Sequence, residues 1–260
     1  MNFTEIIYNC INEVVTITLN RPESLNALSI TMAKEIIRAI EQARSDDNCK
    51  VVVITGSGRA FCAGGDIKAM KIGMSVAKAR NYVLEIGRLI LAMQDLEKPI
   101  IAAVNGYAMG AGFNVVLAAD LIIAAKEAKF GQAFLQVGLA IDAGGSYFLP
   151  RTVGLVRAKE LAFTGRIIDA EEALNMGLIN KVVERERLEQ EVYSLAAKLA
   201  QDPSQALGLT KMLINRGLSA DLETALAYEA LAQSVCMQTE DHKEGLAAFL
   251  EKRAPKFKGK

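Results

Sequence analysis

The N-terminal part of the chain first alternates apolar and polar residues and then changes to helical spacing. Residues 3–9 and 13–20 alternate as the strands of a β-hairpin do, and 9–12 is the expected turn. The apolar positions that follow recur with the period of an α-helix, and Ser29 is placed to cap it. These positions are Ile30, Ala33, Ile36, Ile37 and Ile40. The sequence therefore predicts a hairpin followed by an amphipathic helix.

Three short, continuous apolar runs then predict strands buried on both faces. They are Lys50–Thr55, Ile100–Val104 and Asp120–Ala124, and a helical pattern over roughly 75–96 precedes the second. Strands alternating with helix-length segments indicate βαβ crossovers, so the fold class is α/β with a parallel sheet.

Past residue 155 the pattern is almost entirely helical, with one further strand at Ile179–Val183. Helices are expected at 156–164, 169–176, 186–201, 203–216, 221–237 and 241–252. We divide the chain into an α/β core over 1–195 and a helical C-terminal region over 196–260.

Composition limits the partners. Thirty basic residues balance thirty acidic ones, so we expect neither nucleic acid nor membrane as a partner. The four cysteines form no CxxC pair and read as free thiols, and no signal peptide is visible, so the expected location is cytoplasmic. The basic C-terminal tail, 252–260, is either solvated or a contact for a phosphate-bearing ligand.

The single histidine, His242, lies in an amphipathic helical pattern, where a solvated face is the ordinary interpretation. One histidine leaves little room for a Ser-His-Asp triad or a histidine-rich zinc site. Acid–base chemistry therefore falls to carboxylates, tyrosine, lysine or cysteine.

Three glycine-rich segments, 61–68, 105–113 and 142–146, follow strands or precede helices. Small residues there allow a ligand to approach backbone N–H groups, although each segment could equally be a tight turn. They lack the spacing of a Walker A or Rossmann motif.

Asp142 is the only carboxylate between Lys129 and Arg151, and the intervening residues are mostly apolar. Apolar surroundings raise the pKa of a carboxyl group toward the range of a general acid–base. The alternative is that Asp142 caps the helix expected to begin near Gly144.

Taken in order, these segments resemble the crotonase (enoyl-CoA hydratase/isomerase) superfamily over nearly the whole chain. The resemblance includes Leu19–Pro22, Leu25–Leu28, Phe163–Gly165, Ala170–Ala173, Gly177–Ile179 and Phe249–Arg253. It implies a ββα-superhelix core and a homotrimer or dimer of trimers built partly through the C-terminal helices.

The same resemblance implies an acyl-CoA substrate, whose coenzyme A is not a separate cofactor. With a single histidine in the chain, we expect no metal site. Coenzyme A would lie near Ala27, Ala63, Asp66 and Ile67. The thioester oxygen would accept hydrogen bonds from the backbone N–H groups of Gly65 and Ala111. Proton loss beside a thioester gives an enolate whose charge collects on that oxygen, which is where such donors act.

The chain departs from the hydratases of this superfamily at two positions where they carry glutamates, here Asn114 and Phe134. Neither side chain can be a general base, so hydration is disfavoured. Asp142 matches a catalytic aspartate of isomerases and the nucleophile of an aryl-CoA dehalogenase. With Phe134 and the Leu139–Gly145 loop, the chain most resembles the ring-epoxide isomerases of phenylacetyl-CoA degradation.

The leading hypothesis is an acyl-CoA isomerase in which Asp142 moves a proton between two carbons of a bound acyl group. Phe134, Tyr147 and Phe148 would shape the acyl pocket, or simply pack in the core. The rivals are an atypical hydratase or lyase, nucleophilic attack by Asp142, and a non-catalytic acyl-CoA-binding homologue.

Overall fold

The computed structural model of the chain describes residues 3–67, 73 and 75–260, so Lys68 of the first glycine-rich segment lies outside them. A six-stranded sheet has the order β1-β2-β3-β5-β7-β10. Its strands are β1 (Ile6–Ile11), β2 (Val14–Leu19), β3 (Val51–Gly56), β5 (Ile100–Val104), β7 (Leu121–Ala125) and β10 (Lys181–Val183). β1 pairs antiparallel with β2, and the other neighbours are parallel. The α/β class is confirmed.

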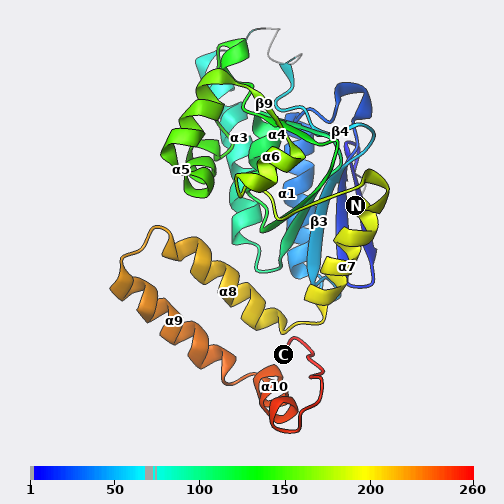
Figure 1. Cartoon of the computed structure of the whole chain (residues 1–260), viewed down its shortest axis with the longest axis vertical. Coiled ribbons are helices and arrows are strands. Elements are labelled where there is room, and N and C mark those ends of the chain that lie inside the picture. The colour runs from blue at the N-terminus through cyan, green and yellow to red at the C-terminus, as the bar shows by residue number, and fades with distance from the viewer. Residues whose placement is uncertain (1–2, 68–72, 74) are drawn as a thin grey trace.

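Both faces of this sheet are covered by helices (Figure 1). Helices α1 (Ile30–Ser45) and α3 (Val76–Asp95) pack together on one face, and α7 (Leu188–Ala200) covers the other. In β3, Val52 and Ile54 belong to the hydrophobic core between the sheet and helices α1 and α3. Val51 and Val53 belong to the core on the side of α7. Because successive side chains of a strand face opposite ways, burial on both faces explains the unbroken apolar runs in the sequence.

A second, four-stranded sheet has no counterpart in the sequence prediction. It has the order β4-β6-β8-β9, and each strand has three residues: Ala60–Cys62, Tyr107–Met109, Lys129–Gly131 and Ile167–Asp169. A run of three residues carries too little periodicity to be recognised. Pairing between segments distant in sequence creates these strands.

The hairpin turn lies farther along the chain than the sequence pattern predicted. β1 continues through Ile11, and the turn consists of Asn12 and Glu13, with φ of 49° and 64°. Two consecutive positive φ values are typical of the type I′ turn, whose twist matches that of the paired strands. The expected turn at 9–12 is therefore wrong, and the turn lies at 12–13.

The helix predictions are largely confirmed. The Ser29 side chain accepts a hydrogen bond from the Met32 N–H and caps α1. The other α-helices of the described residues are α4 (Ala111–Leu117), α5 (Gly145–Thr164), α6 (Ala170–Asn175), α8 (Ser204–Gly217), α9 (Leu222–Cys236) and α10 (Glu240–Leu250). Within the described chain, none of the helices combines the length and the apolarity needed to cross a bilayer.

Helices α8, α9 and α10 extend away from the two sheets (Figure 1). α7 still belongs to the core, because Leu188, Val192 and Ala196 pack on the six-stranded sheet. Residue 195, the boundary drawn from sequence, thus lies inside a core helix, and the helical C-terminal arm begins after Ala200. The tail folds back on α10, where the Asp241 carboxylate accepts hydrogen bonds from the N–H groups of Lys258 and Gly259.

Candidate active site

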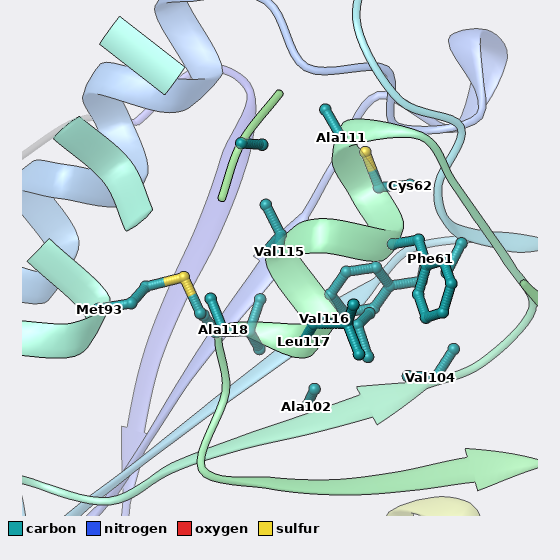
Figure 2. Close-up of a cluster of buried hydrophobic side chains, with 14 of the residues drawn as sticks. Phe61, Cys62, Met93, Ala102, Val104, Ala111, Val115, Val116, Leu117 and Ala118 are labelled. Carbon is teal, nitrogen blue, oxygen red and sulfur yellow. The ribbon is translucent and has the colours of Figure 1, made fainter. Parts of the chain in front are cut away.

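Helix α4 begins against the end of strand β4. A Cβ atom on Gly112 would lie 2.4 Å from the Cys62 carbonyl oxygen, so only glycine permits this contact. Figure 2 shows Ala111 and Cys62 at the same end of α4. A Cβ on Gly64 would likewise lie 3.7 Å from the Ala111 nitrogen. The first two glycine-rich segments are therefore in contact. Ala111, as the first residue of α4, has an N–H without a partner inside its helix.

The Gly65 N–H is directed away from the neighbouring segment that contains Leu28. Leu28 forms a parallel bridge with Gly65, in which the Leu28 N–H bonds to the Gly64 carbonyl and the Leu28 carbonyl accepts from the Asp66 N–H. In a parallel ladder, the residue bridged in this way turns its own N–H to the opposite side. Gly65 and Ala111, the two expected oxyanion donors, thus lie in adjoining segments, and Ala111 is at the start of α4.

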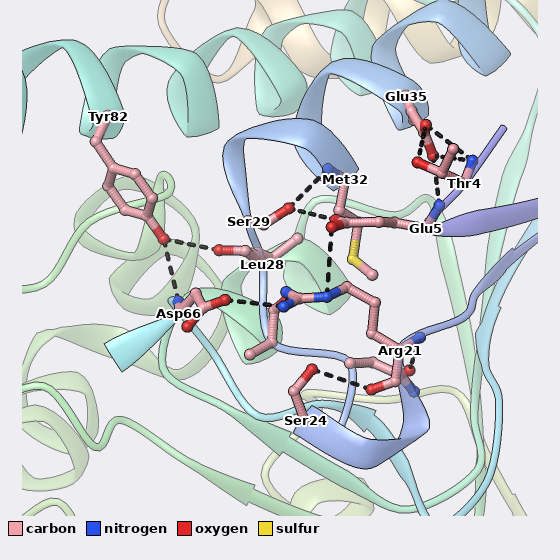
Figure 3. A network of polar contacts seen from close by, with 12 residues as sticks. Thr4, Glu5, Arg21, Ser24, Leu28, Ser29, Met32, Glu35, Asp66 and Tyr82 are labelled. Atoms are coloured by element: carbon pink, nitrogen blue, oxygen red, sulfur yellow. Dashed lines mark hydrogen bonds and ion pairs between the residues drawn. The ribbon is translucent and has the colours of Figure 1, made fainter. Parts of the chain in front are cut away.

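The expected coenzyme A contacts Ala27, Ala63 and Asp66 belong to one hydrogen-bonded region, in which Figure 3 shows Arg21 directed toward Asp66. Arg21 joins two of them: its Nη1 donates to the Ala27 carbonyl at 2.8 Å, and its Nη2 lies 3.0 Å from the Asp66 carboxylate. The Ala63 N–H donates to the Leu25 carbonyl. Ile67 is exposed at the end of this segment. The sequence did not identify Arg21 as the residue that organises this region.

Tyr82 fixes the same segment from helix α3. Its hydroxyl donates to the Leu28 carbonyl at 2.8 Å and accepts from the Asp66 N–H at 3.2 Å. Burial, followed by the negative charges of Asp142 and Asp66, raises the pKa of Tyr82 to about 12. The hydroxyl therefore stays protonated near neutral pH and keeps both hydrogen bonds. No pattern in the sequence distinguished this tyrosine from a core aromatic.

The Asp142 side chain does not cap helix α5. The cap residue is Gly144, and the Gly145 N–H donates to the backbone carbonyl of Asp142, not to its carboxylate. The Oδ1 atom of Asp142 is buried and has no hydrogen-bond partner in the part of the chain that the structure describes. Burial raises the pKa of this carboxyl to about 6. It is a partly desolvated acid with a free acceptor, the state expected of a general base.

Only some of the apolar residues between Lys129 and Arg151 contribute to the burial of Asp142. Leu135, Val137 and Leu139 are 52%, 51% and 42% exposed, so these three do not bury the acid. Phe134 and Ala143 are buried, and Ile141 and Phe148 pack against the core. The desolvation of Asp142 therefore comes from residues adjacent to it and from the core.

Phe134 and Asn114, the two positions at which the resemblance implies glutamate in a hydratase, are both buried. Phe134 is 8% exposed, and its ring lies 3.6 Å from where a Gly110 Cβ would be, directly before the Ala111 N–H. Asn114 is fully buried, and both ends of its amide are engaged. Its Oδ1 accepts from Gln132 Nε2 at 2.7 Å, and its Nδ2 donates to the Asp142 carbonyl at 2.9 Å. Gln132 was not singled out from the sequence.

A cavity of about 1150 Å³ opens beside the start of α5. Gly144, Tyr147 and Phe148 line it together with residues of α3 and α8. Tyr147 is held there by Arg151, 3.6 Å from its ring centroid, and by a 3.2 Å hydrogen bond with Ser219. Tyr147 therefore borders an open apolar space next to the Asp142 loop.

The remaining polar candidates lie elsewhere. His242 is exposed on α10, and the four cysteines are free thiols. Among the described residues, no group of histidine, cysteine and carboxylate side chains is arranged to hold a metal. Asp142, with its buried and unbonded Oδ1, is thus the candidate for acid–base chemistry among the described residues of this region.

Comparison with known proteins agrees with the fold. A family model described as enoyl-CoA hydratase/isomerase matches residues 10–260. The 1,2-epoxyphenylacetyl-CoA isomerase of Escherichia coli is 40% identical over 256 residues, which cover 95% of each chain. The short-chain-enoyl-CoA hydratase of Clostridium acetobutylicum is 39% identical over 254 residues, 97% of each chain.

A solved enoyl-CoA hydratase of Bacillus anthracis superposes with a TM-score of 0.94 at 39% identity, over 99% of this chain and 100% of that one. Full-length matches of this quality extend through the helical arm as well as the core. The chain therefore belongs to the enoyl-CoA hydratase/isomerase family and has the crotonase fold that its sequence resembles.

Proposed function

We propose that this protein is an acyl-CoA isomerase that shifts a double bond, or rearranges a cyclic acyl group, by proton transfer through Asp142. The observation that carries the proposal is the Asp142 carboxyl group itself. Its Oδ1 is buried and accepts no hydrogen bond from the described chain, and its pKa is raised to about 6. Near neutral pH such a group is mostly ionised, yet basic enough to take a proton and return it.

The reaction follows from one base and two backbone donors. Asp142 removes a proton from one carbon of the bound acyl group, and the electron pair moves toward the thioester oxygen. The N–H groups of Gly65 and Ala111 donate to that oxygen, and one such donor is typically worth ~3–4 kcal/mol in the transition state. The protonated Asp142 then delivers the proton to another carbon. No water is consumed.

The position of Asn114 supports isomerisation over hydration. Hydration needs a group that activates water, and the amide of Asn114 is neither a base nor free, because it bonds to Gln132 and to the Asp142 carbonyl. Phe134 offers only an apolar ring, which cannot activate water. Hydratase activity nevertheless remains the alternative candidate, since relatives 39% and 43% identical are named as hydratases.

The substrate contacts are proposed on the same basis. Ala27, Ala63, Asp66 and Ile67 would bind coenzyme A, and Phe134 and Tyr147 would contact the acyl group. The coenzyme A belongs to the substrate, so the reaction as proposed needs no further cofactor. The cavity beside Tyr147 would receive the acyl end, because the surface that lines it is predominantly apolar.

We also propose a homotrimer or a dimer of trimers. Large apolar side chains remain exposed along the C-terminal arm, among them Leu222, Leu231, Phe249 and Leu250. An exposed apolar surface of this kind is typical of an interface. Light scattering would give the mass of three or six chains, and a monomer would contradict the proposal.

A pair of assays separates the two activities. Wild-type protein is incubated with a 3-enoyl-CoA in deuterated water, and the conjugated 2-enoyl product is followed by ultraviolet absorbance and mass spectrometry. Crotonyl-CoA in ¹⁸O-labelled water tests hydration in parallel. We expect conjugated product and little ¹⁸O incorporation. Rapid ¹⁸O incorporation without isomerisation would assign the protein as a hydratase.

A further inference from the structure

Two buried amides connect the Asp142 loop to the helix that carries Ala111. Gln132 is 1% exposed and Asn114 is 0% exposed. Gln132 Nε2 donates to Asn114 Oδ1 at 2.7 Å, and Asn114 Nδ2 donates to the Asp142 carbonyl at 2.9 Å. Burying polar groups is unfavourable unless their hydrogen bonds are made, so this pair is fixed in one arrangement.

The direction of each hydrogen bond is forced. The Asp142 carbonyl can only accept, so Asn114 must turn its NH₂ group toward it. Its oxygen then faces Gln132, which must in turn present its own NH₂ group. Gln132 Oε1 is buried and accepts no hydrogen bond within the described chain, so the bond to Asn114 is what orients the Gln132 amide. The Asp142 carbonyl therefore fixes the orientation of the Asn114 amide, and the hydrogen bond that Gln132 donates supports that orientation.

The geometry of helix α4 makes this arrangement relevant to the chemistry. Ala111 is the first residue of α4, and Asn114 follows three residues later, a rise of about 4.5 Å along the helix axis. The same rigid turn thus presents the Ala111 N–H and holds the Asp142 residue. Gly145 allows the Asn114 amide to pack against the start of α5. Any larger residue would clash, because a Cβ at position 145 would lie 2.3 Å from Asn114 Nδ2.

We infer that Asn114 and Gln132 are positioning residues that set the Asp142 carboxyl against the Ala111 N–H. This rests on the proposed function, in which the acid and the oxyanion donor act on the same substrate. A displacement of about 1 Å between reacting groups can cost about 100-fold in rate. The Asn114 amide acts through Asp142 and takes no part in the proton transfer.

Gln132→Glu is the most informative variant. It conserves size, but its carboxylate offers an acceptor to the Asn114 NH₂ group and competes with the Asp142 carbonyl. We expect kcat for isomerisation to fall about 10- to 100-fold, while KM changes less than about threefold because the proposed coenzyme A contacts are untouched. Gln132→Met, which offers no acceptor, is the matched control and should lose less activity.

A pH series distinguishes positioning from a general loss of structure. When the carboxyl group introduced by Gln132→Glu becomes protonated, its O–H can donate to Asn114 Oδ1 as the glutamine does. The ratio of variant to wild-type kcat should therefore rise as the pH is lowered from about 8 to about 6. A merely destabilised variant would show a flat or falling ratio.

Crystal structures of wild type and Gln132→Glu provide a readout that needs no activity. We expect the Asp142 carboxyl to move relative to the Ala111 nitrogen while α4 stays in place. If folded Gln132→Glu and Asn114→Ala variants both keep kcat within threefold of wild type, or if Asp142 does not move, the inference is overturned. A wild-type protein that does not isomerise would sink only the proposed function, and the structural comparison would still decide the role of the amides.

Discussion

Replacement of Asp142 by asparagine should abolish isomerisation and stabilise the fold. The pKa of this carboxyl rises from 3.8 to about 6 through burial. A shift of about 2 units corresponds to ~3 kcal/mol, because one unit is worth ~1.4 kcal/mol. Asp142 is only partly buried, so we expect solvent to reduce this to about 1–2 kcal/mol. Asparagine removes the charge and keeps the shape.

The sign of the effect depends on pH. The folded protein binds the Asp142 proton more tightly than the unfolded chain does. The contribution of Asp142 to stability is therefore fully present below pH 3.8 and is lost as the pH rises through about 6. Asparagine does not titrate. The stability advantage of Asp142→Asn should thus be near zero at about pH 4 and reach its full size above about pH 7.

Urea unfolding at a fixed protein concentration measures this difference, and Asp47→Asn is the control because Asp47 is exposed. The control should change stability by less than about 0.5 kcal/mol at either pH. Isomerase activity of Asp142→Asn should fall by at least about 100-fold. Equal unfolding midpoints for variant and wild type at pH 4 and pH 8 would refute the desolvated acid, and retained activity would refute its catalytic role.

Other predictions test the same site. In the wild type, kcat/KM should fall about tenfold per unit below pH 6, because protonated Asp142 cannot accept the substrate proton; a profile flat to pH 5 would contradict this. Gly145→Ala should inactivate the protein, since its Cβ would lie 2.3 Å from the Asn114 amide, whereas Gly217→Ala meets no atom within 4 Å and should be neutral or stabilising in thermal unfolding. Arg21→Met removes the cation paired with Asp66 at 3.0 Å and should lower stability by about 1–3 kcal/mol and raise KM more than it lowers kcat; unchanged KM would argue against a role in coenzyme A binding.

Local patterns were sufficient for most of the scaffold. The period of the apolar residues in 30–40 and the cap at Ser29 determined α1, because both depend on residues within a few turns. The β-branched runs at β3 and β5 could be recognised because strands buried on both faces carry no alternation. The three-residue strand β4 could not, because its pairing with β6 involves residues far apart in sequence.

The sequence by itself determined the family, the order of the loops and an acid at position 142 without a neighbouring charge. Only the tertiary structure decided whether that acid caps helix α5, because an N-cap and a free carboxyl have the same local sequence. Folding directs Gly145 to the Asp142 carbonyl and leaves the carboxyl oxygen Oδ1 unbonded within the described chain. The bonds from Gln132 through Asn114 to Asp142 likewise join three segments that no local pattern connects. Helical and strand propensities act over a few residues, whereas the position of a reacting group is set by packing among distant ones.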